Sequence, residues 1–160
     1  MNPVWLSGSQ SEIVIKWVSD QLDGCHRGFN GAVALAVLDG DSIAAAVVYH
    51  DWSPEYQVIS MSAFADDARW LTRRVLWEMF DYPFNRAGCQ MVYLQVSERN
   101  RRMLRIARRF GFDIIRVPRG RGRNEDEILC TLTDDQWRSG RLYRECADGK
   151  TEGTKAARSR

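Results

Sequence analysis

Hydrophobic positions in the first 64 residues change from a helical spacing to an extended one. Residues 9–22 repeat apolar side chains every three or four positions, which predicts an amphipathic helix. Residues 24–31 contain three glycines and end this pattern. Two apolar runs then flank Asp39-Gly40-Asp41, whose residues favour a tight hairpin, and a third run covers residues 57–64. We therefore expect a helix followed by an antiparallel meander of three strands.

Residues 66–133 alternate between helical and extended patterns. A helix is expected over 66–84, with Asp66 and Asp67 at its start and Pro83 at its end. A strand over 89–96 leads into a helix over 99–110, and Gly111 stands where a C-terminal glycine ends a helix. Further strands are expected over 112–117 and 127–133, with a short helix over 134–143.

This order of elements predicts a mixed α/β (α+β) fold. Helices between the third and fourth strands, and between the fourth and fifth, require crossover connections there, after the antiparallel start. Residues 1–143 are expected to form a single domain because no linker or repeat interrupts them. Apolar residues nearly vanish over 144–160, which predicts a disordered tail.

Composition narrows the class of protein. The chain has 160 residues with a net charge of +2, so no strong overall field draws it to nucleic acid or to a membrane. Its start, MNPVWLSGSQ, lacks the basic and apolar segments of a signal peptide, and no apolar run is long enough to cross a bilayer. We expect a cytoplasmic protein. The four cysteines and two histidines have no metal-ligand spacing, so no metal site is expected.

The helix over 99–110 carries the most specific spacing in the chain. Asn100 is followed eleven residues later by Gly111-Phe112, with a leucine and arginines between them. This spacing and the order of elements resemble the GCN5-related N-acetyltransferase (GNAT) superfamily over residues 31–132. The resemblance implies a partly splayed sheet flanked by helices. It also implies transfer of an acetyl group from acetyl-CoA to an amine-bearing acceptor, a small molecule or a protein.

The pyrophosphate loop of that family aligns with residues 67–72, DARWLT. The family has a glutamine or arginine where this chain has Asp67, and glycine where it has Trp70. Arg69, Arg73 and Arg74 could offset the acidic Asp67. The resemblance implies coenzyme contacts at Met61, Ala63, Ala68, Arg69, Trp70, Leu71, Thr72, Arg73, Asn100 and Arg101.

A second departure concerns proton transfer. Many family members place a tyrosine seven residues after the asparagine to protonate the leaving thiolate, and this chain has Ala107 there. Tyr93 and Tyr143 are candidate substitutes for that acid. Glu55 and His50, near the ends of expected strands, are the candidate general bases. The resemblance also places Ser60, Ser62 and Ser97 along the cleft, and Ser97 is a further candidate catalytic residue.

The arginines of residues 99–109 allow three interpretations. They can form a solvated helix face, contact the coenzyme through its N-terminal end, or join Arg116, Arg119, Arg121 and Arg123 as a nucleic-acid patch. We do not favour the last, because acidic residues nearly balance the charge and no aromatic stripe accompanies the arginines.

Two hypotheses on function follow. The first is an active N-acetyltransferase whose acceptor loops are residues 24–31 and 119–126. The second is a degenerate or repurposed member of the same fold, acting in protein interaction, on nucleic acid or in a phage particle, and the lost glycines and the missing tyrosine motivate it. In addition, RWLTRRVL and YPF resemble acetyltransferase-like reading frames of tailed phages. Six tryptophans in so short a chain leave room for an aromatic homodimer interface.

Overall fold

The computed structural model describes residues 1–146, and its strands form one sheet. The seven strands lie in the order β1-β2-β3-β4-β5-β7-β6. Neighbouring strands are antiparallel except β4 and β5, which are parallel and are connected through α2. The elements are β1 (Asn2–Trp5), α1 (Gly8–Gln21), β2 (Val33–Asp39), β3 (Ser42–Ser53), β4 (Val58–Ala65), α2 (Arg73–Asp81), a π-helix (Tyr82–Arg86), β5 (Met91–Ser97), α3 (Arg101–Phe110), β6 (Asp113–Val117), β7 (Glu127–Thr133) and α4 (Asp134–Ser139).

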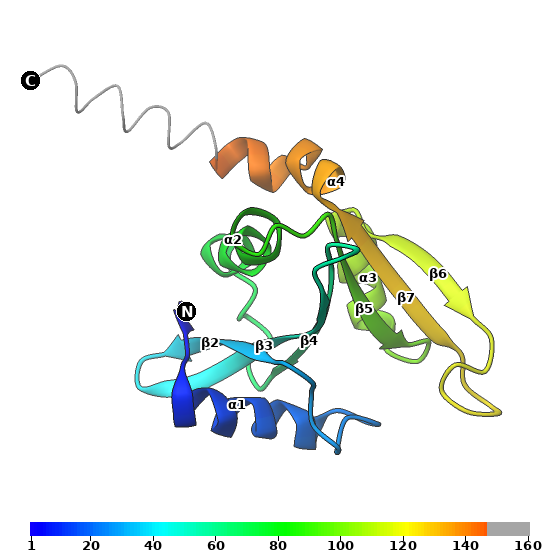
Figure 1. Cartoon of the computed structure of the whole chain (residues 1–160), viewed down its shortest axis with the longest axis horizontal. Coiled ribbons are helices and arrows are strands. Elements are labelled where there is room, and N and C mark those ends of the chain that lie inside the picture. The colour runs from blue at the N-terminus through cyan, green and yellow to red at the C-terminus, as the bar shows by residue number, and fades with distance from the viewer. Residues whose placement is uncertain (147–160) are drawn as a thin grey trace, which may run out of the picture.

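Helices cover both faces of the first four strands (Figure 1). Side chains alternate between the two faces of a strand, so neighbours on β3 join different cores. Val48 packs in the cluster under α1, whereas Val47 and Tyr49 pack in the larger cluster under α2. The larger cluster continues into β5, α3 and β7 and forms the main core of the molecule.

The mixed fold class is confirmed, as are the meander and the two crossovers. β2 and β3 meet at a two-residue loop in which Gly40 has a φ of 60°, as the sequence Asp39-Gly40-Asp41 predicted. α3 ends at Gly111 with a φ of 110°. The Phe112 N–H bonds to the Ala107 carbonyl and the Gly111 N–H to the Arg108 carbonyl, which is the Schellman arrangement that satisfies the last turn.

Three elements differ from the sequence prediction. β1 was not expected, because it is only four residues long and contains Pro3, but an edge strand tolerates proline. α2 begins at Arg73 instead of Asp66, because the Thr72 side chain caps it by accepting the Val75 N–H. Pro83 does not end the helical path, which continues as the π-helix Tyr82–Arg86.

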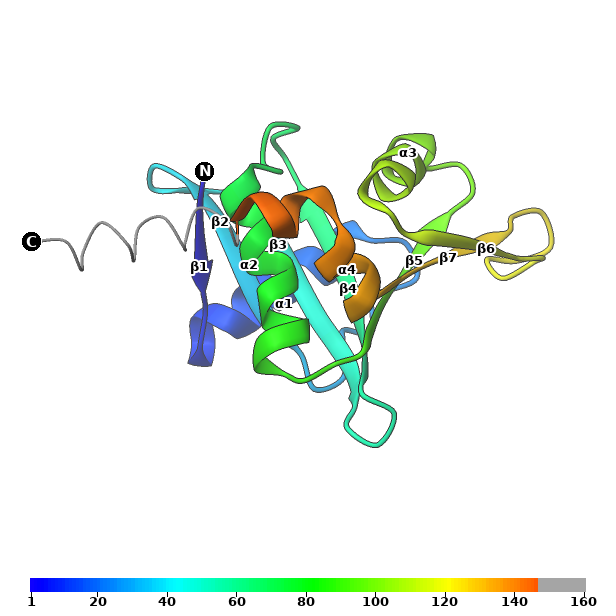
Figure 2. The ribbon, with the colours of Figure 1, turned by 90° about the horizontal axis from the view of Figure 1, so that it is seen from above.

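The chain beyond α4 continues the helical path after Gly140. Residues 141–146 are helical, so the expected tail over 144–160 begins as helix, and the rest of it lies outside the described residues. This segment passes beside α2 in both views (Figures 1 and 2). Within residues 1–146, no helix combines the length and apolar character that crossing a bilayer requires.

Candidate functional site

The main cleft opens where β4 and β5 part. These strands pair only over Val58–Ser60 and Met91–Tyr93, and they then diverge, as Figure 1 shows. Past the last pair, residues of both strands line a cleft of about 800 Å³. From β4 they are Met61, Ser62 and Ala63, and from β5 Leu94, Gln95, Val96 and Ser97.

The divergence leaves a backbone donor of β4 facing the cleft. In an antiparallel pair, alternate residues direct their N–H and C=O groups toward the partner strand. The Asp66 N–H bonds to the Ala44 carbonyl, which shows which backbone groups of β4 point to which neighbour. The N–H and C=O groups of even-numbered β4 residues point toward β3, and those of odd-numbered residues point toward β5. The Ala63 N–H therefore points toward β5 at a level where β5 has already left. It is an unpaired strand donor in the wall of the cleft.

The side of the cleft under α2 and α3 is largely apolar. Met61 and Ala63 project toward the α2 face, where both belong to the main core cluster. Trp70 and Leu71 close the cleft above them and pack against the same cluster. The remaining walls come from α2 with Leu76, Met79 and Phe80, and from α3 with Met103, Ile106, Ala107 and Phe110.

The segment before α2 forms a charged turn. The Arg69 guanidinium bonds to both carboxylate oxygens of Asp67, and the Arg69 N–H also donates to that carboxylate. These hydrogen bonds lower the pKa of Asp67 to about 2. Asp67 therefore acts as the partner of Arg69 and not as the start of a helix. The Ala68 carbonyl accepts a hydrogen bond from Arg102 of α3, which brings a second arginine to this turn.

Asn100 occupies the position that its sequence spacing indicated. Its side chain caps α3 by accepting the Met103 N–H at 3.0 Å, and it lines the cleft. The arginines that follow are exposed, which is compatible with all three interpretations of this helix. Arg101, beside Asn100, does not line the cleft.

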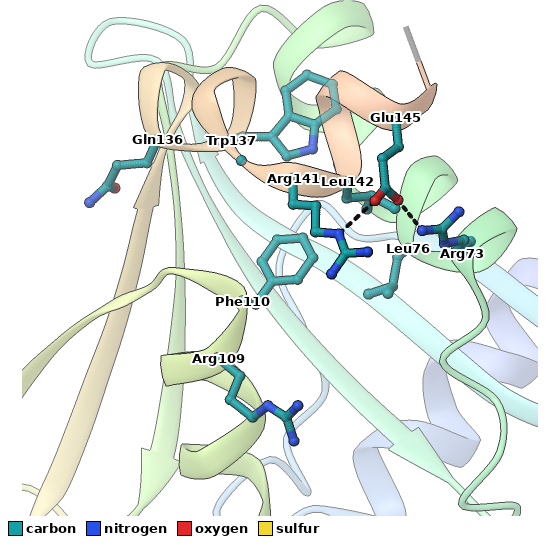
Figure 3. Close-up of a pocket in the computed structure, with 10 residues that line it drawn as sticks. Arg73, Leu76, Arg109, Phe110, Gln136, Trp137, Arg141, Leu142 and Glu145 are labelled. Carbon is teal, nitrogen blue, oxygen red and sulfur yellow. Dashed lines mark hydrogen bonds and ion pairs between the residues drawn. The ribbon is translucent and has the colours of Figure 1, made fainter. Parts of the chain in front are cut away.

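Arg73 faces a second, smaller cavity instead of the main cleft. This cavity of about 390 Å³ lies between α2, α3 and the C-terminal helical segment (Figure 3). The Glu145 carboxylate bonds to Arg73 and to Arg141, and both arginines help to lower the pKa of Glu145, Arg141 most. The first residue of α2 is thus already in contact with an acidic group of the same chain.

The predicted coenzyme contacts divide accordingly. Met61, Ala63, Trp70, Leu71 and Asn100 line the main cleft. The others lie outside its wall, where they build the turn and the helix starts that border it. These are Ala68, Arg69, Thr72, Arg73 and Arg101.

The opposite side of the cleft is polar. His50 and Ser62 line it from the face of the sheet that α1 covers, and their side chains are hydrogen-bonded. Gly24 and Cys25 contribute from the first predicted acceptor loop, and Gly120, Arg121 and Glu125 contribute from the second. Both loops therefore border the cleft. The role of acceptor loop stays a prediction for each.

Arg121 connects these two loops. Its guanidinium pairs with Glu127 at 2.8 Å and with Glu125 at 3.4 Å, and it also donates to the Asp23 carbonyl across the cleft. Ser97, predicted from the sequence to line the cleft, does so and donates its hydroxyl to Glu125. Sequence reasoning named the loop 119–126 but missed Asp23, Glu125 and Glu127, because only the folded chain brings these acidic groups to one cleft.

Two candidate catalytic residues lie outside the cleft. Glu55 lies in the exposed turn between β3 and β4 and is absent from the cleft wall. Tyr93 belongs to the last residue pair before β5 diverges from β4, so it lies in the paired part of the strands and not in the cleft wall. Tyr143 packs on Trp77 and Trp137, and no tyrosine of residues 1–146 lines the cleft. Of the two candidate bases, only His50 lines the cleft.

Comparison with solved structures identifies the architecture. Spermidine N-acetyltransferase SpeG from Vibrio cholerae superposes with a TM-score of 0.71 at 11% identity, covering 87% of this chain and 98% of that chain. A candidate acetyltransferase from T. thermophilus superposes with a TM-score of 0.61 at 16% identity, covering 72% of this chain and 64% of that chain. The chain has the fold of the GCN5-related N-acetyltransferases.

Sequence comparison adds nothing to this result. No protein-family profile and no curated protein matches the sequence. The chain spans only about 64% of the length of the T. thermophilus protein, while it spans nearly all of SpeG. At such low identities the likeness concerns the fold alone.

Proposed function

We propose that this protein is an acyl-CoA-dependent N-acyltransferase that moves an acetyl group to an amine. The observation that carries the proposal is the unpaired Ala63 N–H in the wall of the cleft, between its apolar and its polar side. A thioester carbonyl that accepts this N–H becomes more electrophilic, and the donor also stabilises the oxyanion that forms when the amine attacks.

The cleft fits the acyl and pantetheine end of acetyl-CoA. Met61, Leu71 and Met79 offer an apolar channel that ends at the backbone donor of Ala63. The coenzyme would supply the activated acetyl group as its thioester. Bound there, acetyl-CoA would place its thioester carbonyl carbon between β4 and β5, where the apolar and polar sides of the cleft meet.

The phosphate end fits less closely. The bulky Trp70 lines the cleft where the family has glycine, and Arg69 is held by Asp67. Arg102, which reaches Ala68, and the exposed Arg74 remain as cations beside the start of α2. Arginine binds phosphate oxygens through two parallel hydrogen bonds, so these two residues would hold the diphosphate.

The acceptor would enter from the polar side. His50 is the general base of the proposal, since it lines the cleft on the face opposite the apolar channel. Acidic Asp23, Glu125 and Glu127 also line this side, and Arg99 and Arg121 nearly balance their charge. Spermidine is the first acceptor to assay, because SpeG, which shares the fold, is a spermidine N-acetyltransferase.

The leaving group needs no tyrosine in this proposal. Ala107 lines the cleft at the position where the family often has a tyrosine. An alkyl thiol has a pKa of about 8.5, so its thiolate is an adequate leaving group near neutral pH. The absence of a phenol in the described cleft wall is therefore compatible with turnover.

Calorimetry with acetyl-CoA is the first test. We expect saturable heat with the wild-type protein, and no heat at millimolar acetyl-CoA would contradict the proposal. That result would favour the alternative of a degenerate or repurposed protein of this fold. The resemblance to phage reading frames rests on the sequence alone and stays a prediction.

Replacing Ala63 by proline tests the backbone donor directly. Proline lacks an N–H, and the Ala63 N–H takes no part in the β3–β4 ladder, so Ala63→Pro removes the donor without breaking a bond to β3. Turnover should fall about 100- to 1,000-fold, as for other lost oxyanion donors. Ala65→Pro, two residues along the same strand and in the same phase, is the matched control.

A further inference from the structure

Three polar side chains of β3 and β4 form a continuous hydrogen-bonded chain at the cleft. Nδ1 of His50 lies 2.7 Å from Oδ2 of Asp51, and Nε2 lies 2.9 Å from Oγ of Ser62. The strand register pairs His50 with Ser60, so Ser62 is its diagonal neighbour on the same face of the sheet. A base bonded both to a hydroxyl and to an orienting carboxylate is the arrangement by which enzymes activate a hydroxyl.

Asp51 and Ser62, on the two sides of His50, determine which atom donates in each of these hydrogen bonds. A carboxylate can only accept hydrogen bonds, so the Asp51 contact assigns the imidazole proton to Nδ1. In the neutral ring Nε2 is then an acceptor, and the Ser62 hydroxyl donates to it. The lone pairs of the Ser62 oxygen remain free to accept a proton from a group in the cleft.

The surroundings hold the ring in this orientation. His50 is 6% exposed, and its ring packs on Phe29 at a centroid distance of 4.5 Å. Asp51 has a φ of 50°, an uncommon value for a residue other than glycine, and its N–H bonds to the Asn30 carbonyl at 3.2 Å. This turn of the backbone accompanies the contact of the carboxylate with its neighbouring imidazole. Asp51 itself is exposed, so the hydrogen-bonded side chains of Ser62, His50 and Asp51 connect the cleft with solvent.

Ser62 also adjoins the backbone donor. It precedes Ala63 on β4, and its side chain projects to the polar side of the sheet, from which the acceptor would enter. An amine attacking a carbonyl held by the Ala63 N–H therefore comes close to the Ser62 hydroxyl. His50 reaches the same point only through that hydroxyl, because its Nε2 is already engaged.

We propose that Ser62, His50 and Asp51 form a proton relay in which Ser62 is the group that contacts the acceptor amine. The inference rests on the proposed acyl transfer. As the N–C bond forms, the amine proton passes to Oγ of Ser62 while the Ser62 proton passes to Nε2 of His50. The C–S bond breaks, the thiolate leaves, and the imidazolium formed beside Asp51 returns its proton to the thiolate or to water.

The tautomer of His50 is measurable without any turnover. The chain has two histidines, so His26→Gln leaves His50 as the only imidazole for ¹⁵N nuclear magnetic resonance. We expect the proton on Nδ1, and we expect Asp51→Asn to move it partly or wholly to Nε2. A wild-type ring protonated at Nε2 would overturn the relay.

Kinetics with acetyl-CoA and spermidine test the role of the hydroxyl. Ser62→Ala should lower kcat about 100-fold, the usual effect of losing a proton-transfer group, and leave the KM for acetyl-CoA unchanged. Ser62→Thr, which keeps a hydroxyl, should recover part of this loss. Ser60→Ala is the matched control, since Ser60 lies on the same face of β4 but outside the cleft wall.

Other outcomes separate the relay from the proposed function. Full turnover by Ser62→Ala would overturn the relay and leave the acyltransferase intact. Mass spectrometry that finds the acetyl group on Ser62 during turnover would also overturn it, because the serine would then be a nucleophile. If the wild-type protein binds no acetyl-CoA, no variant needs to be tested. That result overturns the proposed function together with the relay.

Discussion

The Glu145 carboxylate lies against the Arg73 guanidinium at the first residue of α2, although 72 positions separate them in the chain. The positive end of a helix and an arginine together attract anions. In this structure the anion that they meet is part of the chain itself (Figure 3). Glu145 therefore competes with any phosphate group that approaches this end of α2.

Glu145→Gln should strengthen the binding of acetyl-CoA. The substitution removes a negative charge and releases Arg73, so we expect about a two- to fivefold lower Kd at low salt, the range of one exposed ion pair. Calorimetry in low and high salt measures the effect, which should shrink as salt screens the charges. Glu12→Gln, on the exposed face of α1, is the control for net charge. An unchanged Kd at low salt would contradict the competition.

Asn100 should act on stability before it acts on coenzyme binding. Asn100→Ala removes the side chain that accepts the Met103 N–H and should cost about 1 kcal/mol of unfolding free energy. Asn100→Ser keeps a capping oxygen and should lose much less. Urea unfolding measures both variants. Equal stability of all three proteins would show that the cap does not hold α3.

The pair of Asp67 and Arg69 predicts a dependence of stability on pH. The Arg69 hydrogen bonds lower the pKa of Asp67 to about 2, below its ordinary value of about 3.9. A carboxyl group with a depressed pKa contributes stability above its unfolded-state pKa, and the contribution is lost as pH falls toward the folded-state value. Asp67→Asn should therefore lower the Tm near neutral pH, and the difference from wild type should close between about pH 4 and pH 2.

Thermal melts across that pH range provide the measurement. Asp66→Asn is the control, because it makes the same change of charge one residue earlier but keeps the contact between Asp67 and Arg69. A constant Tm difference between wild type and Asp67→Asn at all pH values would exclude the pair as its source.

Arg121 should control both the stability and the charge of the acceptor side. Arg121→Gln leaves the partly buried Glu127 without its cation and leaves Glu125 paired with Arg99 alone, which should cost about 1–3 kcal/mol of unfolding free energy. The same change removes one positive charge from the cleft wall, so the KM for spermidine should fall. Arg123→Gln, an exposed position in the same loop, is the matched control. A higher KM for spermidine would contradict this charge argument.

Most helices and strands could be predicted from the sequence, because periodicity and turn residues are local patterns. Helical periodicity and Gly111 predicted α3 with its end, and alternation along residues 89–96 predicted β5, in which Val92, Leu94 and Val96 are the buried side. β1 escaped prediction because its stability comes from pairing with β2, which no local pattern reveals. The start of α2 was misplaced because Asp66 and Asp67 also suit a helix start, whereas the side chain that caps the helix is that of Thr72.

The site was less predictable because it depends on strand register. His50 was named as one of two candidate bases, but the sequence could not say that it meets Ser62 diagonally across two strands. Glu55 was an equal candidate until the turn between β3 and β4 placed it outside the cleft. The divergence of β4 from β5, which frees the Ala63 N–H, has no signature in the residues that line it.

The short parallel seam between β4 and β5 has a mechanical consequence. Three residue pairs, from Val58–Met91 to Ser60–Tyr93, carry the whole strand pairing between a four-stranded half and a three-stranded half of the sheet. The other neighbouring strands of the sheet pair over four or more residues, so this seam is the shortest strand pairing that the sheet contains. The sheet therefore has its least backbone reinforcement directly at the closed end of the cleft.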